Sequence, residues 1–238
     1  METQIVLGDI VADVILKDIK NVHLSVYPPN GHVRISAPER MSLDTIRAYT
    51  VSKLSWIRQQ QTKLRAQERI TPREYVDGES HYVWGKRYLL RVTETASSPR
   101  VVLRARHIEL YVRAGTNAER RSEILEGWLR QELKSSAKVL IEKWEPKLSV
   151  QVSAFHVQRM KTKWGSCSSE KGFIRLNTEL SKKPVECLEY IVVHEMVHLI
   201  ERSHNARFVR LMDEFLPKWK FYRDELNRLP VRHEDWQY

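Results

Sequence analysis

The stretch YIVVHEMVHLIERSH, residues 190–204, constrains the fold of this chain more than any other part of its sequence. An apolar run leads into His194 and His198, which lie four positions apart and therefore project from one face of an α-helix, close enough to bind one metal ion. Six further residues, at about 100° each, would carry His204 off that face if the helix continued. We therefore predict a buried helix that ends between His198 and His204, with the chain folding His204 back toward the other two. Ser203 and Asn205 could supply the break by capping the next helix.

Glu195 directly follows the first histidine. In the pattern H-E-x-x-H the glutamate does not bind the metal; it acts as general base toward a metal-activated water. A catalytic site needs three protein ligands and an open position, and we expect His204 to be the third ligand. Glu201 is the alternative third ligand, and Asp213 or Glu214 are weaker candidates. A helix whose histidines only form hydrogen bonds is the alternative without a metal.

Zinc is the expected ion, although imidazole ligands also suit Mn²⁺, Co²⁺ and Ni²⁺. Of the two cysteines, Cys167 could contribute a metal ligand or a nucleophile, whereas Cys187 belongs to the expected core. We expect both to be buried structural thiols instead.

A basic segment precedes the histidine helix. Its residues Lys161 and Lys163, with Arg175 further on, could face the metal and grip an anionic group, either a carboxylate or a phosphate. A solvated basic hairpin is the alternative interpretation. The sequence Trp164-Gly165-Ser166-Cys167 in this segment suits a tight turn that approaches a ligand closely.

Two segments, MKTKWGSCSSEKGFIRLNTELSKKP and YIVVHEMVHLIERSHNARF, resemble the YgjP-like metallopeptidase family of metal-dependent hydrolases, which is related to the zincins. By this resemblance His194, His198 and His204 would be zinc ligands and Glu195 the general base. The resemblance also implies a zincin-like α+β fold with a strand near residues 173–177 beside the site. Glu201 departs from the related metzincin pattern, which has a glycine at the turn.

Hydrophobic periodicity outlines the rest of the fold as α+β. We predict a hairpin over residues 22–36, a helix capped by Ser42 and running to Leu64, a second β-rich region over residues 81–112, a long helix capped by Asn117 and stopping near Pro146, a helix opened by Pro184, and a final amphipathic helix over residues 205–226. Residues 161–172 are expected to link two strands. These elements suggest an N-terminal α+β region, residues 1–115, and a zincin-like hydrolase domain, residues 116–238, which could form one integrated domain.

The formal net charge of the 238 residues is +10, which favours anionic partners. The basic residues are spread along the chain, so a nucleic-acid partner is permitted but not favoured. We expect a soluble, cytoplasmic protein without a membrane partner, because the chain has neither a basic apolar leader nor about 18 uninterrupted apolar residues.

Three functions fit these features. The first is a zinc metallopeptidase that takes a peptide substrate. The second is a nucleoside triphosphate pyrophosphatase whose basic loop binds the phosphates of an anionic small molecule. The third is a nucleic-acid-binding accessory protein with a structural metal, although structural zinc sites usually close with four protein ligands.

Overall fold

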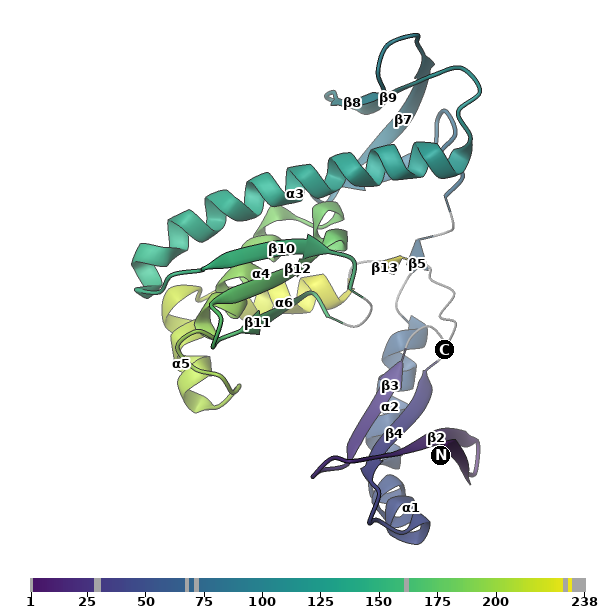
Figure 1. The fold of residues 1–238 in the computed structure, drawn as a ribbon, viewed down its shortest axis with the longest axis vertical. Helices are drawn as coiled ribbons and strands as arrows, with labels where there is room; N and C mark the ends of the chain where they lie inside the picture. Colours follow the sequence, from purple (N-terminus) through teal and green to yellow (C-terminus); the bar gives the residue numbers. More distant parts are fainter. Residues whose placement is uncertain are drawn as a thin grey trace. The chain divides into compact units, whose positions relative to one another are not determined.

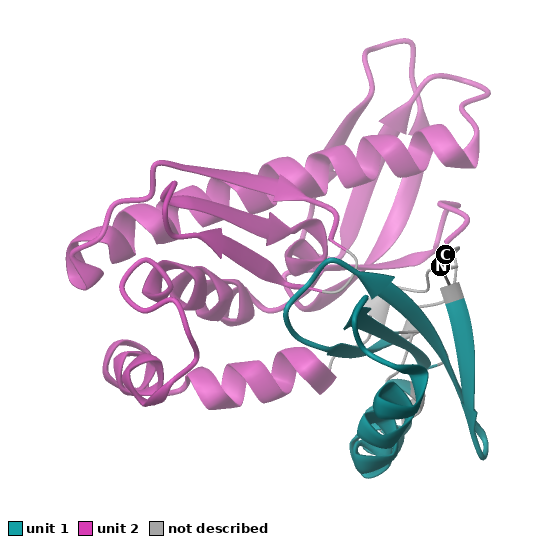
Figure 2. Cartoon of the chain, turned by 60° about the horizontal axis from the view of Figure 1, so that its bottom comes forward, with its two compact units in different colours: residues 1–71, 230–238 teal, residues 72–229 magenta. Residues whose placement is uncertain are grey.

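The computed structural model describes residues 2–27, 31–66, 69–70, 73–160, 163–228 and 231–232. Helices and strands occur throughout (Figure 1), so the α+β class is confirmed. The chain separates into two compact units, residues 1–71 with 230–238 and residues 72–229 (Figure 2). Within the described ranges, no helix has the length and apolar character that crossing a membrane requires.

Unit 1 contains a four-stranded sheet of order β1-β2-β4-β3, formed by β1 (Glu2–Leu7), β2 (Ile10–Lys17), β3 (His23–Tyr27) and β4 (His32–Pro38). The antiparallel pairing of β3 with β4 confirms the predicted hairpin. Alternate residues of β2 and β4 are buried and form the core with Ile46 and Ile57 of the two helices that follow. A short parallel pair, β5 (Arg69–Ile70) with β13 (Val231–Arg232), completes the unit.

The helix predicted from Ser42 to Leu64 is wrong in one respect, since the structure has two helices, α1 (Leu43–Ser52) and α2 (Leu54–Ala66). Ser42 caps α1 as expected, accepting a hydrogen bond from the backbone of Thr45. The break lies at Lys53, whose N–H donates to the carbonyl of Thr50 only three residues back. The buried Thr50 hydroxyl donates to the Ile46 carbonyl, a local bond that tends to bend helices.

Unit 2 begins with a second four-stranded sheet of order β6-β7-β9-β8, formed by β6 (Ser80–Val83), β7 (Lys86–Glu94), β8 (Arg100–Leu103) and β9 (His107–Val112). The long helix α3 (Ala118–Leu148) follows, and the Asn117 side chain caps it as predicted, 2.9 Å from the Arg120 nitrogen. Leu125 and Leu129 of α3 pack on this sheet, while its later apolar residues join the second core of the unit. The domain boundary expected between residues 115 and 116 thus falls inside unit 2, because α3 belongs to both cores.

The stop expected near Pro146 is confirmed to within two residues, since α3 ends at Leu148 and its C-cap, Ser149, has a left-handed φ of 53°. Pro146 lies in the last turn, and burial of Leu148 in the core favours keeping that turn helical.

The second half of unit 2 is built on a three-stranded sheet of order β10-β12-β11, formed by β10 (Ala154–Gln158), β11 (Gly165–Ser168) and β12 (Phe173–Asn177). β12 is parallel to β10 and antiparallel to β11. A 3-10 turn, η1 (Thr178–Lys182), leads to three helices, α4 (Val185–Val197), α5 (Ala206–Phe215) and α6 (Trp219–Arg228).

The single final helix predicted over residues 205–226 is therefore wrong. The chain leaves the helical conformation at Leu216, which has φ −136° and ψ 71°. Pro217 explains the break, because it has no N–H to donate and its ring disfavours a helical conformation for the residue before it.

Candidate metal centre

The helix α4 carries the motif and is apolar on nearly all sides. Its residues from Tyr190 to Val193, with Met196 and Val197, are buried against Ile174 and Leu176 of the small sheet. A helix that is hydrophobic all round is an interior helix. α4 ends at Val197, where Leu199 and Ile200 donate to carbonyls three residues back. The helix therefore ends one residue before the predicted interval between His198 and His204, with His198 as its C-cap, and the expected break before His204 is present.

The turn that follows brings His204 back to α4. Asn205 caps α5 as expected, with its Oδ1 accepting from the backbone nitrogens of Arg207 at 2.9 Å and Phe208 at 3.0 Å. The Nε2 atom of His204 lies 3.0 Å from that of His194 and 3.1 Å from that of His198. Two nitrogen ligands of a tetrahedral zinc ion lie about 3.3 Å apart, so the three imidazoles fit one ion.

The surroundings fix the orientation of these rings. Phe208, which is 2% exposed, packs with its ring centroid 4.7 to 4.9 Å from each of the three imidazoles. The Nδ1 atom of His198 lies 3.1 Å from the Glu201 carbonyl oxygen, a contact that leaves Nε2 free to bind metal when Nδ1 carries the proton. The His194 Nδ1 is buried and has no hydrogen-bond partner within the described part of the chain.

The electrostatics favour neutral imidazoles. Burial, followed by the neighbouring His198 and His204, lowers the pKa of His194 to about 3. Burial likewise lowers the pKa of His198. Both rings are therefore neutral near pH 7, which is the form that binds a metal.

Glu195 is buried next to this cluster, with 5% of its surface exposed. It abuts β11 so closely that a Cβ atom on Gly165 would lie 2.6 Å from its Oε1. Burial raises the pKa of Glu195 to about 8, although the Lys163 ammonium opposes the shift. A carboxyl group whose pKa lies near neutrality can both accept and return a proton.

These groups open onto a cavity of about 400 Å³. Besides the histidines and Glu195, its wall includes Lys163, Trp164, Gly165, Ser166, Cys167, Ser169, Ile191 and Arg202. Trp164 lies in the segment expected to approach a ligand, whereas Arg202 was not among the residues expected to contact substrate. Arg202 carried no local signal, because only the fold brings the loop after α4 opposite the strand β11.

Of the three residues expected to bind an anion, the structure places one in the cavity wall and one on the exposed face of β12. Lys163 lines the cavity. Arg175 is exposed on the opposite face of β12 from the buried Ile174 and Leu176, with its guanidinium 4.8 Å from the Phe173 ring centroid. Lys161 lies outside the described residues.

The rival ligands point elsewhere. The Glu201 carboxylate accepts hydrogen bonds from the Ser203 backbone and hydroxyl, and Asp213 accepts from Trp219. Glu214, the other weaker candidate, is exposed on α5. In the parts of the chain that the structure describes, the three histidines are the one set of three or more potential ligands arranged for an ion.

The two cysteines differ in burial. Cys187 is fully buried, as expected, whereas Cys167 is half-buried and lines the cavity. Burial, together with the charge of Glu195, raises the pKa of Cys167 to about 11, so this side chain is a thiol rather than a thiolate at neutral pH.

Residues 20–229 match the family model described as YgjP-like, metallopeptidase domain. The chain belongs to the YgjP-like metallopeptidase family. Membership of this family supports a metal-dependent peptidase and implies a divalent metal. No curated protein matches the chain.

Two crystal structures of archaeal metallopeptidase zymogens are similar to part of this YgjP-like chain. Abylysin of Pyrococcus abyssi is 24% identical, with 40% of this chain and 99% of that chain covered at a TM-score of 0.36. Jannalysin of Methanocaldococcus jannaschii is 22% identical, with 38% and 92% covered at a TM-score of 0.34.

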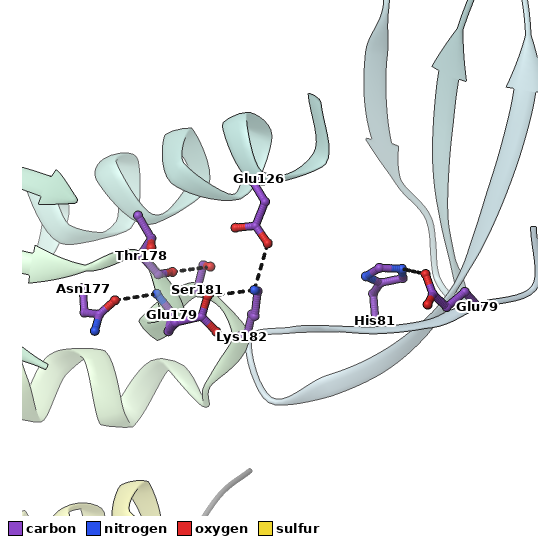
Figure 3. Close-up of polar contacts among 8 residues, drawn as sticks. All are labelled: Glu79, His81, Glu126, Asn177, Thr178, Glu179, Ser181 and Lys182. Carbon is purple, nitrogen blue, oxygen red and sulfur yellow. Dashed lines mark hydrogen bonds and ion pairs between the residues drawn. The ribbon is translucent and has the colours of Figure 1, made fainter. Parts of the chain in front are cut away.

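A partly buried polar network precedes the histidine helix in this YgjP-like chain (Figure 3). The Lys182 ammonium lies 3.0 Å from a carboxylate oxygen of Glu126 on α3 and 2.9 Å from one of Glu179 on η1. The turn between β6 and β7 joins the same region, since the backbone nitrogen of Trp84 donates to the Ser181 carbonyl at 2.9 Å. The first residues of α4 are thus held by both α3 and the neighbouring sheet.

Proposed function

We propose that this protein is a zinc-dependent peptidase of zincin-like architecture, in which His194, His198 and His204 hold the ion and Glu195 is the general base. The observation that carries the proposal is the convergence of three Nε2 atoms, with separations of 3.0 and 3.1 Å, beside a buried carboxyl group. The closed alternative, a structural zinc site, fits less well because such sites usually have four protein ligands.

The chain's own residues have distinct tasks in this proposal. A Zn²⁺ ion bound by the histidines supplies Lewis acidity, lowering the pKa of a water molecule and polarising the scissile carbonyl. Glu195, shielded from bulk solvent, accepts the proton of the attacking water and passes it to the leaving amine nitrogen. The Glu201 carbonyl orients His198, and Phe208 packs against all three rings. Mn²⁺, Co²⁺ or Ni²⁺ could replace zinc at three imidazoles.

The strand β11 is suited to bind an extended peptide. It is an edge strand in the order β10-β12-β11, and three of its residues, Gly165, Ser166 and Cys167, line the cavity. An extended substrate could add to such an edge through backbone hydrogen bonds. Lys163 and Arg202 stand at the same cavity and would favour acidic side chains in that peptide. The same role for Lys161 and Arg175 stays a prediction.

Peptide hydrolysis is tested by incubating the zinc-loaded protein, and the zinc-loaded Glu195→Gln variant, with casein and separately with nucleoside triphosphates. We expect peptide fragments from the wild type alone, and equal zinc content in both proteins. Release of pyrophosphate without proteolysis would replace the peptidase with the pyrophosphatase, and equal proteolysis by the variant would remove Glu195 from its role.

The family match gives no support to nucleotide hydrolysis or to nucleic-acid binding. The net charge of +10 is compatible with either but selects neither. A peptide is therefore the proposed substrate, and a cytoplasmic location stays a prediction.

A further inference from the structure

The connection from β10 to β11 has to cross the end of another strand. β10 and β11 flank β12 on opposite sides, and β10 runs parallel to β12 while β11 runs antiparallel to it. The end of β10 and the start of β11 therefore lie at the same end of the sheet, next to the last residue of β12. The two outer strands are about 10 Å apart, because β12 separates them. Backbone groups in such a crossing have no ladder partner and need other hydrogen bonds.

Asn177, the last residue of β12, supplies those bonds. Its side-chain nitrogen Nδ2 donates to the carbonyl oxygens of Met160 and Lys163, each at 2.8 Å. Its Oδ1 accepts from the backbone nitrogens of Glu179 at 3.2 Å and Met160 at 3.4 Å. The amide orientation follows from this set, because both carbonyls can only accept. One buried side chain, 5% exposed, thus ties both ends of the crossing to the start of η1 (Figure 3 shows the Glu179 bond).

The crossing leads directly into the wall of the candidate metal centre. The backbone nitrogen of Asn177 also donates to the Trp164 carbonyl at 2.9 Å. A second buried residue, Lys183, holds the same wall, with its ammonium 5.7 Å from the Trp164 ring centroid. The next residue, Gly165, is the one that abuts the Glu195 carboxyl group. A displacement of Lys163 or Trp164 would therefore be transmitted within two residues to the contact with Glu195.

We propose that Asn177 is a positioning residue for peptide cleavage, which sets the place of β11 against Glu195 through its bonds to Met160 and Lys163. This inference rests on the proposed peptidase function. Asn177 is neither one of the three histidines nor one of the residues that line the cavity. It therefore acts through β11 and not through the ion.

The variant Asn177→Ser isolates this role. A serine hydroxyl can still cap η1 by accepting from the backbone, but it is too short to bridge the two carbonyls and can donate to only one group. The matched control is Asn117→Ser, which makes the same change at the cap of α3. Both variants are compared with wild type as zinc-loaded full-length proteins, by the kcat and KM of peptide cleavage per zinc-bound molecule, by zinc affinity and by thermal unfolding.

We expect Asn177→Ser to lower kcat by about 10- to 100-fold, with zinc affinity unchanged. Its thermal midpoint should fall more than that of the control, because two carbonyls around a buried side chain lose their donor. Asn117→Ser should keep the wild-type kcat. A purely structural role would lower the thermal midpoint of Asn177→Ser in the same way but leave kcat per zinc-bound molecule within about twofold of wild type, and that result would overturn the proposal.

Hydrogen exchange gives a readout that does not depend on catalysis. Amides of residues 165–168 in zinc-loaded Asn177→Ser should exchange at least about tenfold faster than in wild type, whereas α4 should keep its protection. Unchanged exchange in β11 would contradict the proposal even if activity fell. A wild type that cleaves no peptide would refute the proposed function, and the exchange data would then decide alone whether Asn177 places β11.

Discussion

Replacing Gly165 by alanine adds a single methyl group at the point where β11 meets the general base. The new Cβ would lie 2.6 Å from Glu195 Oε1, 2.9 Å from Glu195 Cγ and 2.9 Å from Ile191 Cγ2. Ordinary contacts between carbon atoms are about 3.5 Å or longer, so neighbouring atoms must move by about 0.6 to 0.9 Å. Gly165 does not have a positive φ, so alanine brings no backbone strain and the effect is steric.

Rotation of the carboxylate alone cannot relieve these contacts, because two of the three atoms are γ-carbons close to the α4 backbone. We expect overpacking to cost about 1 to 3 kcal/mol of unfolding free energy. Displacement of a catalytic group by about 1 Å can lower the rate about 100-fold. Gly165→Ala should therefore lose about 100-fold in kcat/KM while it still binds zinc through the histidines.

The assay is peptide cleavage by zinc-loaded protein, with zinc content measured on the same samples. Gly127→Ala is the matched control, because a Cβ at Gly127 has no atom within 4 Å and the residue lies inside α3. That control should keep full activity and gain about 0.5 to 1 kcal/mol in stability. A folded Gly165→Ala protein with kcat/KM within about twofold of wild type would refute the proposed contact between β11 and Glu195.

Three further predictions concern stability. In the metal-free protein the folded-state pKa of Glu195, about 8, lies above its ordinary value of 4.5, so the folded state holds a proton that the unfolded state releases. The unfolding free energy of wild type relative to Glu195→Gln should therefore fall by on the order of 2 kcal/mol between pH 6.5 and 8, measured by urea unfolding with chelator present. The comparison with Glu195→Gln removes the opposing contribution of His194, which in the unfolded state loses its proton in the same range. Lys182→Met removes the cation beside the partly buried carboxylates of Glu126 and Glu179 and should cost up to about 3 kcal/mol in denaturant unfolding, less than for a fully buried pair; a cost below about 1 kcal/mol would contradict the ion-pair account. Gly85→Ala places a Cβ 2.8 Å from Pro184 at a residue with φ of 77° and should cost about 2 to 4 kcal/mol by the same measurement, whereas an unchanged midpoint would show that the turn does not abut α4.

The parts of the fold that the sequence predicted are those determined by neighbouring residues. Ser42, Asn117 and Asn205 each cap the helix that their side chains suggested, because a cap is a bond to an amide two or three residues away. A break in the helix before His204 was predictable for a similar reason, since helical geometry alone forbids all three imidazoles from sharing one face, although α4 ends at Val197, one residue earlier than expected.

The parts that the sequence did not predict depend on distant contacts. β11 has the sequence Gly-Ser-Cys-Ser, without a β-branched or alternating apolar pattern, and it is a strand because β12 pairs with it. The requirement for glycine at position 165 comes from Glu195, thirty positions further along the chain. Arg202 reaches the cavity only through the turn that also returns His204. Pro217 did carry a local signal for the break between α5 and α6, which the amphipathic pattern on both sides obscured.

The most direct test of the account is the zinc K-edge X-ray absorption spectrum of the zinc-loaded protein, compared with that of His204→Ala. We predict one zinc ion per chain with three imidazole nitrogens and one oxygen at about 2.0 to 2.2 Å, and the loss of one imidazole in the variant. A sulfur ligand at about 2.3 Å, which would implicate Cys167, or a wild-type spectrum retained by His204→Ala would contradict the three-histidine site.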